Sequence, residues 1–87
     1  SLFNILVMSE LDQQMLLQKL SVLEHEQWTS WAKKILETEN ISEETRAKWA
    51  SYFVDFQDLP AEIQNLDRDF AKKSLDVFID YVNTKNI

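Results

Sequence analysis

Carboxylate, imidazole and amide groups interrupt the apolar pattern of a predicted helix in the stretch Leu23–Lys34, which reads LEHEQWTSWAKK. At about 100° per residue, Glu24 and Gln27 fall inside the arc that carries the leucines and tryptophans, and His25 falls at its edge. A carboxylate in an apolar stripe needs a charged or hydrogen-bonding partner, because burial disfavours its ionised form. These residues therefore form either a structural polar network or part of a site.

A second carboxylate stands in the same kind of position in another predicted helix. Asp67 falls inside that helix's apolar stripe, and Arg68 falls at the edge of the stripe. In one interpretation, the polar residues form a buried hydrogen-bond network that sets helix register; in the other, they orient arginine and aromatic side chains around a ligand. The network comprises Glu24, His25, Gln27 and Asp67. The candidate donors to Glu24 and Asp67 are Arg46, Arg68, Gln27, His25, Trp28, Trp31 and Trp49.

The aromatic and basic residues favour one class of ligand. An indole ring can stack on a nucleobase, and an arginine can hold the phosphate with paired hydrogen bonds. If a face of these residues stays open, this combination suits a small nucleotide-like anion. The residues assigned to its binding are Trp28, Trp31, Arg46, Trp49 and Arg68.

No motif for catalysis or metal binding accompanies these residues. The segment His25–Trp28 lacks the second histidine of H-E-x-x-H, and the chain contains one histidine and no cysteine. Without a nucleophile or a metal cluster beside them, Glu24 and Asp67 do not make a hydrolytic pair. We therefore expect a non-catalytic protein that needs neither metal nor cofactor.

The elements that position these residues are predicted to be helices, because the 87 residues include no glycine and only one proline. Ser9 is a candidate N-cap, with Asp12 at the third helical position. From this cap, the apolar periodicity predicts a first helix over residues 10–38, long enough that we expect a kink or an intermolecular contact.

Two further helices follow. Asn40 or Ser42 caps a second helix over residues 43–54. Pro60 suits the first turn of a third helix over residues 61–83, since its missing N–H has no helical partner at that point.

The whole chain, residues 1–87, is expected to be a single all-α domain, either a three-helix bundle or a helical hairpin with a long first helix. Residues 1–9 make an apolar N-terminal arm, centred on Leu2–Met8, and residues 84–87 make a frayed tail.

Apolar stripes should face the core. The first helix carries Leu16, Leu17, Leu20, Leu23, Trp28, Trp31 and Ile35, with a second apolar group of Leu11, Met15, Val22 and Leu36. The second helix turns Arg46, Trp49, Ala50 and Phe53 inward, and the third carries Ile63, Leu66, Phe70, Ala71, Val77, Phe78 and Tyr81. This apolar surface is large for so short a chain, so a homo-oligomer is expected.

The charge balance excludes some partners. Fifteen acidic and nine basic residues give a net charge of −6, which disfavours general binding to nucleic-acid backbones. No apolar run has the length of about 18 residues that a membrane span requires. We therefore expect a cytoplasmic protein that does not bind membranes.

Two segments resemble a known group of proteins. LEHEQWTSWAKKI and KWASYFVDFQDLPAEIQNLDRDFAKKSLDVF are similar to small helical phage proteins and to the ryanodine-receptor-type repeat domain. The similarity covers roughly residues 20–80, with Phe56 where the repeat usually has a tyrosine. The matching positions are His25, Gln27, Trp28, Trp31, Trp49, Leu59, Asp67, Arg68 and Ala71.

The resemblance implies a nucleotide-type ligand and, for a phage protein, a role against host defence signalling in the host-cell cytoplasm. The leading hypothesis is a self-associating helical protein that binds or sequesters a nucleotide-like signalling molecule. The alternative is a module that binds a host or phage protein, with all the polar motif residues structural.

Overall fold

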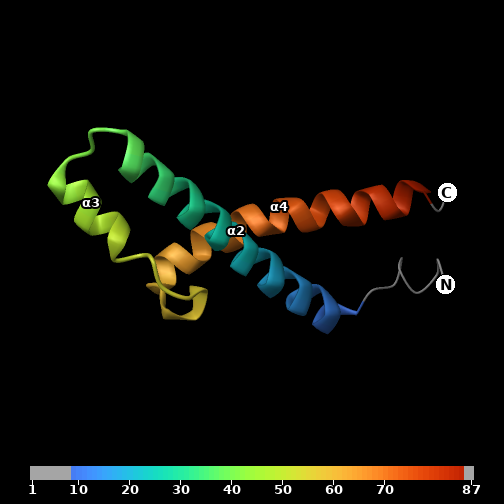
Figure 1. Ribbon diagram of the computed structural model, residues 1–87. Coiled ribbons are helices and arrows are strands. Elements are labelled where there is room, and N and C mark those ends of the chain that lie inside the picture. The colour runs from blue at the N-terminus through green and yellow to red at the C-terminus, as the bar shows by residue number, and fades with distance from the viewer. Residues whose placement is uncertain (1–8, 86–87) are drawn as a thin grey trace.

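The computed structural model describes residues 9–85, which form three α-helices and one short 3₁₀-helix (Figure 1). In chain order they are α2 (Glu10–Thr38), α3 (Glu43–Ala50), η1 (Phe56–Asp58) and α4 (Ala61–Lys85). The prediction of an all-α fold with a long first helix is confirmed. The predicted arm Leu2–Met8 lies outside the described residues.

Serine side chains begin two of the helices. The Ser9 hydroxyl accepts the backbone N–H of Asp12 at 3.0 Å, and the Ser42 hydroxyl accepts that of Thr45 at 3.2 Å. Each bond satisfies a backbone donor that has no partner inside its own helix. Ser9 is thus confirmed as a cap, and Ser42 rather than Asn40 is the cap of α3.

The carboxyl end of α2 is held by Arg46 of α3. Its guanidinium donates to the carbonyl oxygens of Leu36 at 2.9 Å, Glu39 at 3.1 Å and Ile41 at 3.1 Å. The last turn of α2 contains no basic residue of its own, so Arg46 supplies the positive charge that a helix carboxyl end favours. This contact folds α3 back against α2 after a short connection.

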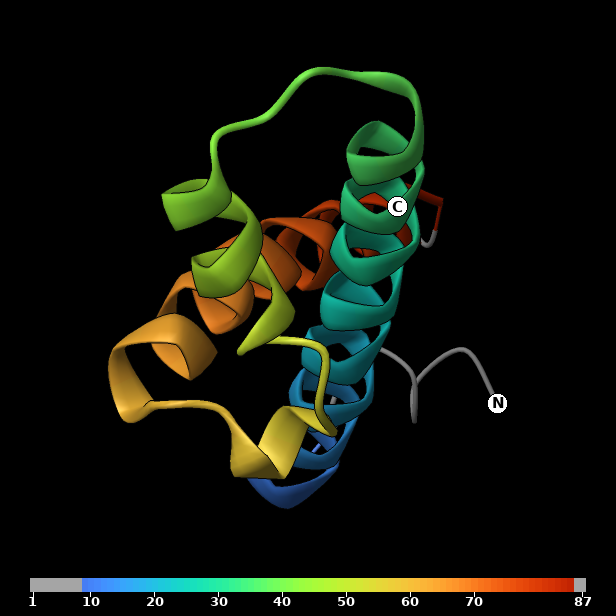
Figure 2. The ribbon, with the colours of Figure 1, turned by 60° about the vertical axis from the view of Figure 1, so that its left-hand side comes forward.

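Helices α2 and α4 cross each other to make the main packing contact of the chain (Figures 1 and 2). Ser21 on α2 and Ala71 on α4 have no exposed surface, and Leu75 is also buried. Small side chains at these positions let the two backbones approach closely. The Ser21 hydroxyl is satisfied locally, because it donates to the Leu17 carbonyl at 2.8 Å.

The buried face of α4 differs from the predicted one. Of the predicted stripe only Ala71 is buried, whereas Leu66, Phe70, Val77 and Tyr81 are 58%, 59%, 70% and 59% exposed. The face that packs on α2 is turned by about 100° from this stripe. The prediction was wrong because the largest apolar residues of α4 do not lie on its buried face, where the close crossing leaves room only for small side chains such as that of Ala71.

The buried face of α2 also departs from expectation. His25, placed at the edge of the apolar arc, is buried, whereas Gln27 is exposed. Leu23 and Trp31 were predicted to be inside, yet they are 56% and 52% exposed. The helix is continuous over its 29 residues, Glu10–Thr38.

Helix α3 is shorter than predicted, since it ends at Ala50 rather than near residue 54. The connection that follows contains η1, whose Phe56 is buried. Gln64 of α4 ties this connection down by donating from its amide to the carbonyls of Gln57 at 3.2 Å and Leu59 at 2.9 Å. At the other end, α4 includes Thr84 and Lys85, which had been expected in a frayed tail.

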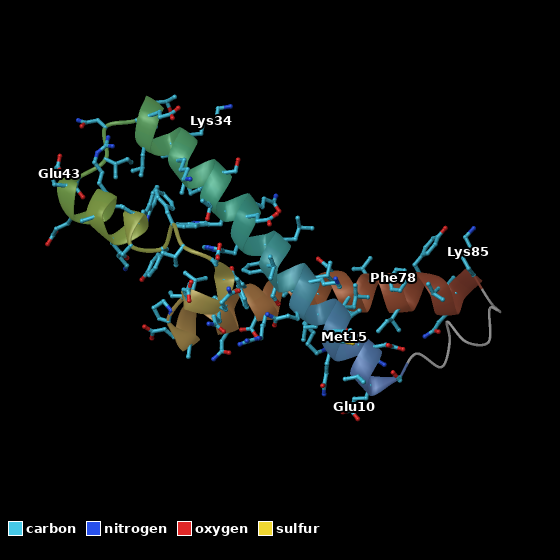
Figure 3. All side chains as sticks on the ribbon, turned by 60° about the horizontal axis from the view of Figure 1, so that its bottom comes forward. Glu10, Met15, Lys34, Glu43, Phe78 and Lys85 are labelled. Atoms are coloured by element: carbon cyan, nitrogen blue, oxygen red, sulfur yellow. The ribbon has the colours of Figure 1, made fainter. Side chains whose placement is uncertain are left out.

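The chain is extended for its size. Its radius of gyration is 16.7 Å, against about 12 Å for a compact domain of this length. Beyond the crossing, the half of α2 that carries Glu10 and Met15 and the half of α4 that carries Phe78 and Lys85 diverge from each other (Figures 1 and 3). Within the described residues, no helix combines the length and the apolar character needed to cross a membrane.

Replacing Arg46 should loosen the contact between α3 and α2. Arg46→Ala removes three charge-assisted bonds to carbonyl oxygens, so we expect the free energy of unfolding to fall by about 2 kcal/mol in urea titration. The control is Lys48→Ala on the exposed side of α3, which should change it by less than about 0.5 kcal/mol. Equal losses in the two variants would contradict this role of Arg46.

Candidate functional site

A cleft of about 570 Å³ opens between α2, α3 and α4. Its volume lies in the range of about 300–1,000 Å³ that is typical of ligand sites. The side chains that line it come from all three helices and from the turn after α3: Glu24, His25, Trp28, Lys48, Trp49, Tyr52, Glu62, Ile63, Leu66, Asp67 and Phe70.

Aromatic rings build one wall of the cleft around Trp28. The Trp28 ring centroid lies 6.0 Å from that of Trp49, 6.1 Å from that of Tyr52 and 5.9 Å from that of Phe53. The rings of Trp49 and Tyr52 meet it edge to face, which is a favourable geometry for aromatic pairs at this distance. This cluster attaches α3 and its following turn to the middle of α2.

His25 supports the aromatic wall from within. Its ring stacks on Trp28 with centroids 6.3 Å apart, and its Nε2 lies 2.7 Å from the carbonyl oxygen of Val54. Because a carbonyl oxygen can only accept, Nε2 carries the proton in this bond. His25 also lines a second cavity of about 480 Å³, so its buried ring borders both hollows.

Carboxylates dominate the charge of the cleft. Glu24, Glu62 and Asp67 line it, whereas Lys48 is the one lysine among the lining residues. One Asp67 carboxylate oxygen is buried without a hydrogen-bond partner among the described residues. Burial raises the pKa of Asp67 above its usual value, the charge of nearby His25 opposes that rise, and the charge of Glu24 adds to it.

The structure brings together five of the nine residues singled out in the sequence, namely Glu24, His25, Trp28, Trp49 and Asp67. Gln27 is exposed on α2, and Trp31 stands behind Trp49 at 5.7 Å without lining the cleft. Both arginines are engaged elsewhere. Arg46 binds the end of α2, and Arg68 donates to Asn65 and Gln64 while its guanidinium lies over the Phe56 ring at 5.5 Å.

The remaining lining residues were not predicted as site residues. Lys48 on α3 and Glu62 on α4 are exposed, and Tyr52 lies beyond the end of α3. Leu66 and Phe70 were assigned to the core, although they are more than half exposed at the cleft. Their exposed apolar surface follows from the way α4 is rotated on α2, which periodicity alone does not reveal.

The arrangement suits a positively charged organic group. Aromatic faces attract cations through their negative quadrupole, and carboxylates supply hydrogen-bond acceptors and opposite charge. Among the described residues, no group of three or more histidine, aspartate and glutamate side chains is placed to hold a metal ion.

Truncating His25 should destabilise the wall of the cleft. His25→Ala loses the bond to Val54 and leaves a void under Trp28, so we expect the free energy of unfolding to fall by about 2–3 kcal/mol. The neighbouring Glu26→Ala, at an exposed position, serves as the control and should stay within about 0.5 kcal/mol of the parent. Thermal and urea unfolding measure both variants, and a His25→Ala protein of parental stability would refute the supporting role.

Neutralising Asp67 should stabilise the fold at neutral pH. Since burial raises the Asp67 pKa, the ionised carboxylate weakens the folded state above that pKa, and protonation relieves the penalty as the pH falls. Asp67→Asn should therefore melt a few degrees higher than the parent at pH 7, and the difference should shrink on acidification. Asp69→Asn, an exposed change on the same helix, is the control. A lower melting temperature for Asp67→Asn at pH 7 would mean that the carboxylate has a stabilising partner.

Comparison of the chain with protein-family models, with curated proteins and with solved structures finds no match. The resemblance to phage helical proteins and to the ryanodine-receptor-type repeat gains no support from these comparisons and stays a prediction.

Proposed function

We propose that this chain is a non-catalytic helical interaction module whose cleft receives a lysine or arginine side chain of a protein partner. The observation that carries the proposal is the composition of the cleft, which is lined by three carboxylates and four large aromatic rings but by a single lysine. A cation held over an aromatic face gains about 0.5–2 kcal/mol, and an adjacent carboxylate adds a charge-assisted hydrogen bond.

The buried oxygen of Asp67 supports the same class of ligand. An ammonium group brought into the cleft would give this oxygen a charge-assisted hydrogen bond, which it lacks among the described residues. It would also balance Glu24, whose charge acts on Asp67 across the contact between α2 and α4. The neutralisation of two neighbouring carboxylates by one cation is a favourable source of binding energy.

A nucleotide-like anion stays the competing prediction. Its phosphate would have to face Glu24, Glu62 and Asp67, and the charges of the cleft weigh against that placement. The two arginines assigned to the phosphate, Arg46 and Arg68, do not line the cleft. The role in host defence evasion was tied to such a ligand and likewise stays a prediction.

Titration with the peptide trilysine tests the proposal. Trp28 and Trp49 line the cleft, so bound trilysine should change tryptophan fluorescence at low ionic strength and lose affinity as salt is added. Triglutamate and cyclic diadenylate, titrated in parallel, should give no change. Binding of the cyclic dinucleotide without binding of trilysine would overturn the proposal in favour of the anionic ligand.

Matched glutamate variants locate the binding. Glu24→Gln should weaken trilysine binding about tenfold, which corresponds to about 1.4 kcal/mol. Glu37→Gln makes the same change of charge at an exposed position near the end of α2, outside the cleft, and should leave the affinity within about twofold. Equal effects of the two substitutions would show that trilysine responds to net charge and not to the cleft.

A further inference from the structure

The exposed apolar residues of α4 form a regular seam along one face. Ile63, Phe70 and Val77 recur every seven residues, and Leu66 and Tyr81 flank them on the same side. Four of these five side chains are more than half exposed, although they are among the largest apolar residues of the helix. A seam with this spacing is typical of helices that pair with another helix, and α2 packs on a different face.

The seam is also symmetric about its own midpoint, between Lys73 and Ser74. Leu66 and Tyr81 lie equally far from this point on either side, and so do Phe70 and Val77. The same midpoint relates the oppositely charged residues Glu62 and Lys85. A second copy of α4 laid antiparallel across the seam would therefore set Leu66 against Tyr81, Phe70 against Val77 and Glu62 against Lys85, each pair occurring twice.

We propose that α4 pairs antiparallel with α4 of a second copy of this chain, through this seam. A two-fold interface requires a surface that complements itself, and the residue pairs on either side of the midpoint provide apolar contact at the centre and opposite charges at the ends. The opposite directions of the two helices also bring the amino end of each beside the carboxyl end of the other.

The surface available is adequate for a specific pair. The four exposed side chains of the seam, Leu66, Phe70, Val77 and Tyr81, offer on the order of 500 Å² per copy, or about 1,000 Å² for both, at the lower limit of specific interfaces. In one copy alone, Val77 and Tyr81 in the carboxyl half of α4 are 70% and 59% exposed. Pairing covers that surface with the same surface of another copy.

The pairing gives the cleft a specific occupant and in this respect rests on the proposed function. Ile63, Leu66 and Phe70 belong both to the seam and to the lining of the cleft, and Glu62 also lines the cleft. In the antiparallel arrangement, Lys85 and Tyr81 of the second copy arrive at Glu62 and Leu66, the acidic edge of the cleft. The basic group that the cleft receives is then Lys85 of another copy.

Light scattering on the full chain tests the pairing. The parent protein should show about twice 10.3 kDa at high concentration, and Val77→Glu and Tyr81→Glu should each reduce it to the mass of a single chain with unchanged helical circular dichroism. Leu11→Glu, which is 65% exposed on α2, is the matched control and should leave the larger mass intact. A parent that stays at the mass of one chain up to millimolar concentration would overturn the proposal, and so would equal effects of the three substitutions.

A charge-reversal cycle tests the direction of the helices. Glu62→Lys and Lys85→Glu should each weaken the dimer about threefold to tenfold, and the double variant, which restores both opposite pairs, should recover most of the loss. Additive losses in the double variant would reject the antiparallel register.

Cross-linking gives an independent reading, because the chain has no cysteine of its own. A mixture of Leu66→Cys and Tyr81→Cys proteins should form a mixed disulfide-linked dimer. Tyr81→Cys alone should not, since its two thiols would lie about 22 Å apart. Efficient cross-linking of Tyr81→Cys with itself would indicate a parallel pair and overturn the proposal.

One experiment distinguishes failure of the proposed pairing from failure of the proposed function. Trilysine binding to the single-chain Val77→Glu variant tests the cleft without any second copy, because Val77 does not line it. If the parent dimerises but Val77→Glu does not bind trilysine, the pairing is supported and the proposed function is rejected. If Val77→Glu binds trilysine but the parent does not dimerise, the proposed function is supported and the pairing is rejected. If both hold, trilysine should bind Val77→Glu more tightly than the parent, in which Lys85 competes.

Discussion

The close crossing of α2 over α4 is the contact on which the rest of the chain depends. Ser21 and Ala71 have no exposed surface, and neither has a side chain that could hold the backbones apart. A close approach of this kind supplies dispersion contacts along two helices without large apolar side chains. It also leaves the larger apolar residues of α4 to be used elsewhere. The crossing therefore determines both how α2 and α4 are held together and which apolar residues of α4 stay exposed.

The helices themselves could be predicted from short-range signals. Ser9 and Ser42 each accept a hydrogen bond from the backbone N–H of the residue three positions later, and Pro60 directly precedes α4. These signals predict the first residue of each helix correctly. The face that each helix turns toward the core could not be predicted from such short-range signals. Periodicity finds the stripe with the most apolar area, and in α4 that stripe runs through Phe70 and Val77, whereas packing selected Ala71 and Leu75.

The candidate site was likewise predicted only in part. Glu24 and Asp67 stood out in the sequence because carboxylates interrupted apolar stripes, and both do line one cleft. The arginines were assigned to that neighbourhood on chemistry alone. Arg46 instead closes the end of α2, and Arg68 holds Gln64, which in turn holds the connection before α4. A basic residue on a short chain has many carbonyls within reach, and only the fold shows which of them it binds.

A small change in the angle at which α4 crosses α2 near Ala71 produces a large displacement of the carboxyl end of α4. From Ala71 to its end at Lys85, α4 extends about 21 Å, so a change of about 10° in the crossing angle would move that end by about 4 Å. A larger residue at Ala71 or Ser21, neither of which lines the cleft, would tilt the helix and change the width of the opening between α3 and α4. The width of the cleft would thus depend on positions that do not line it.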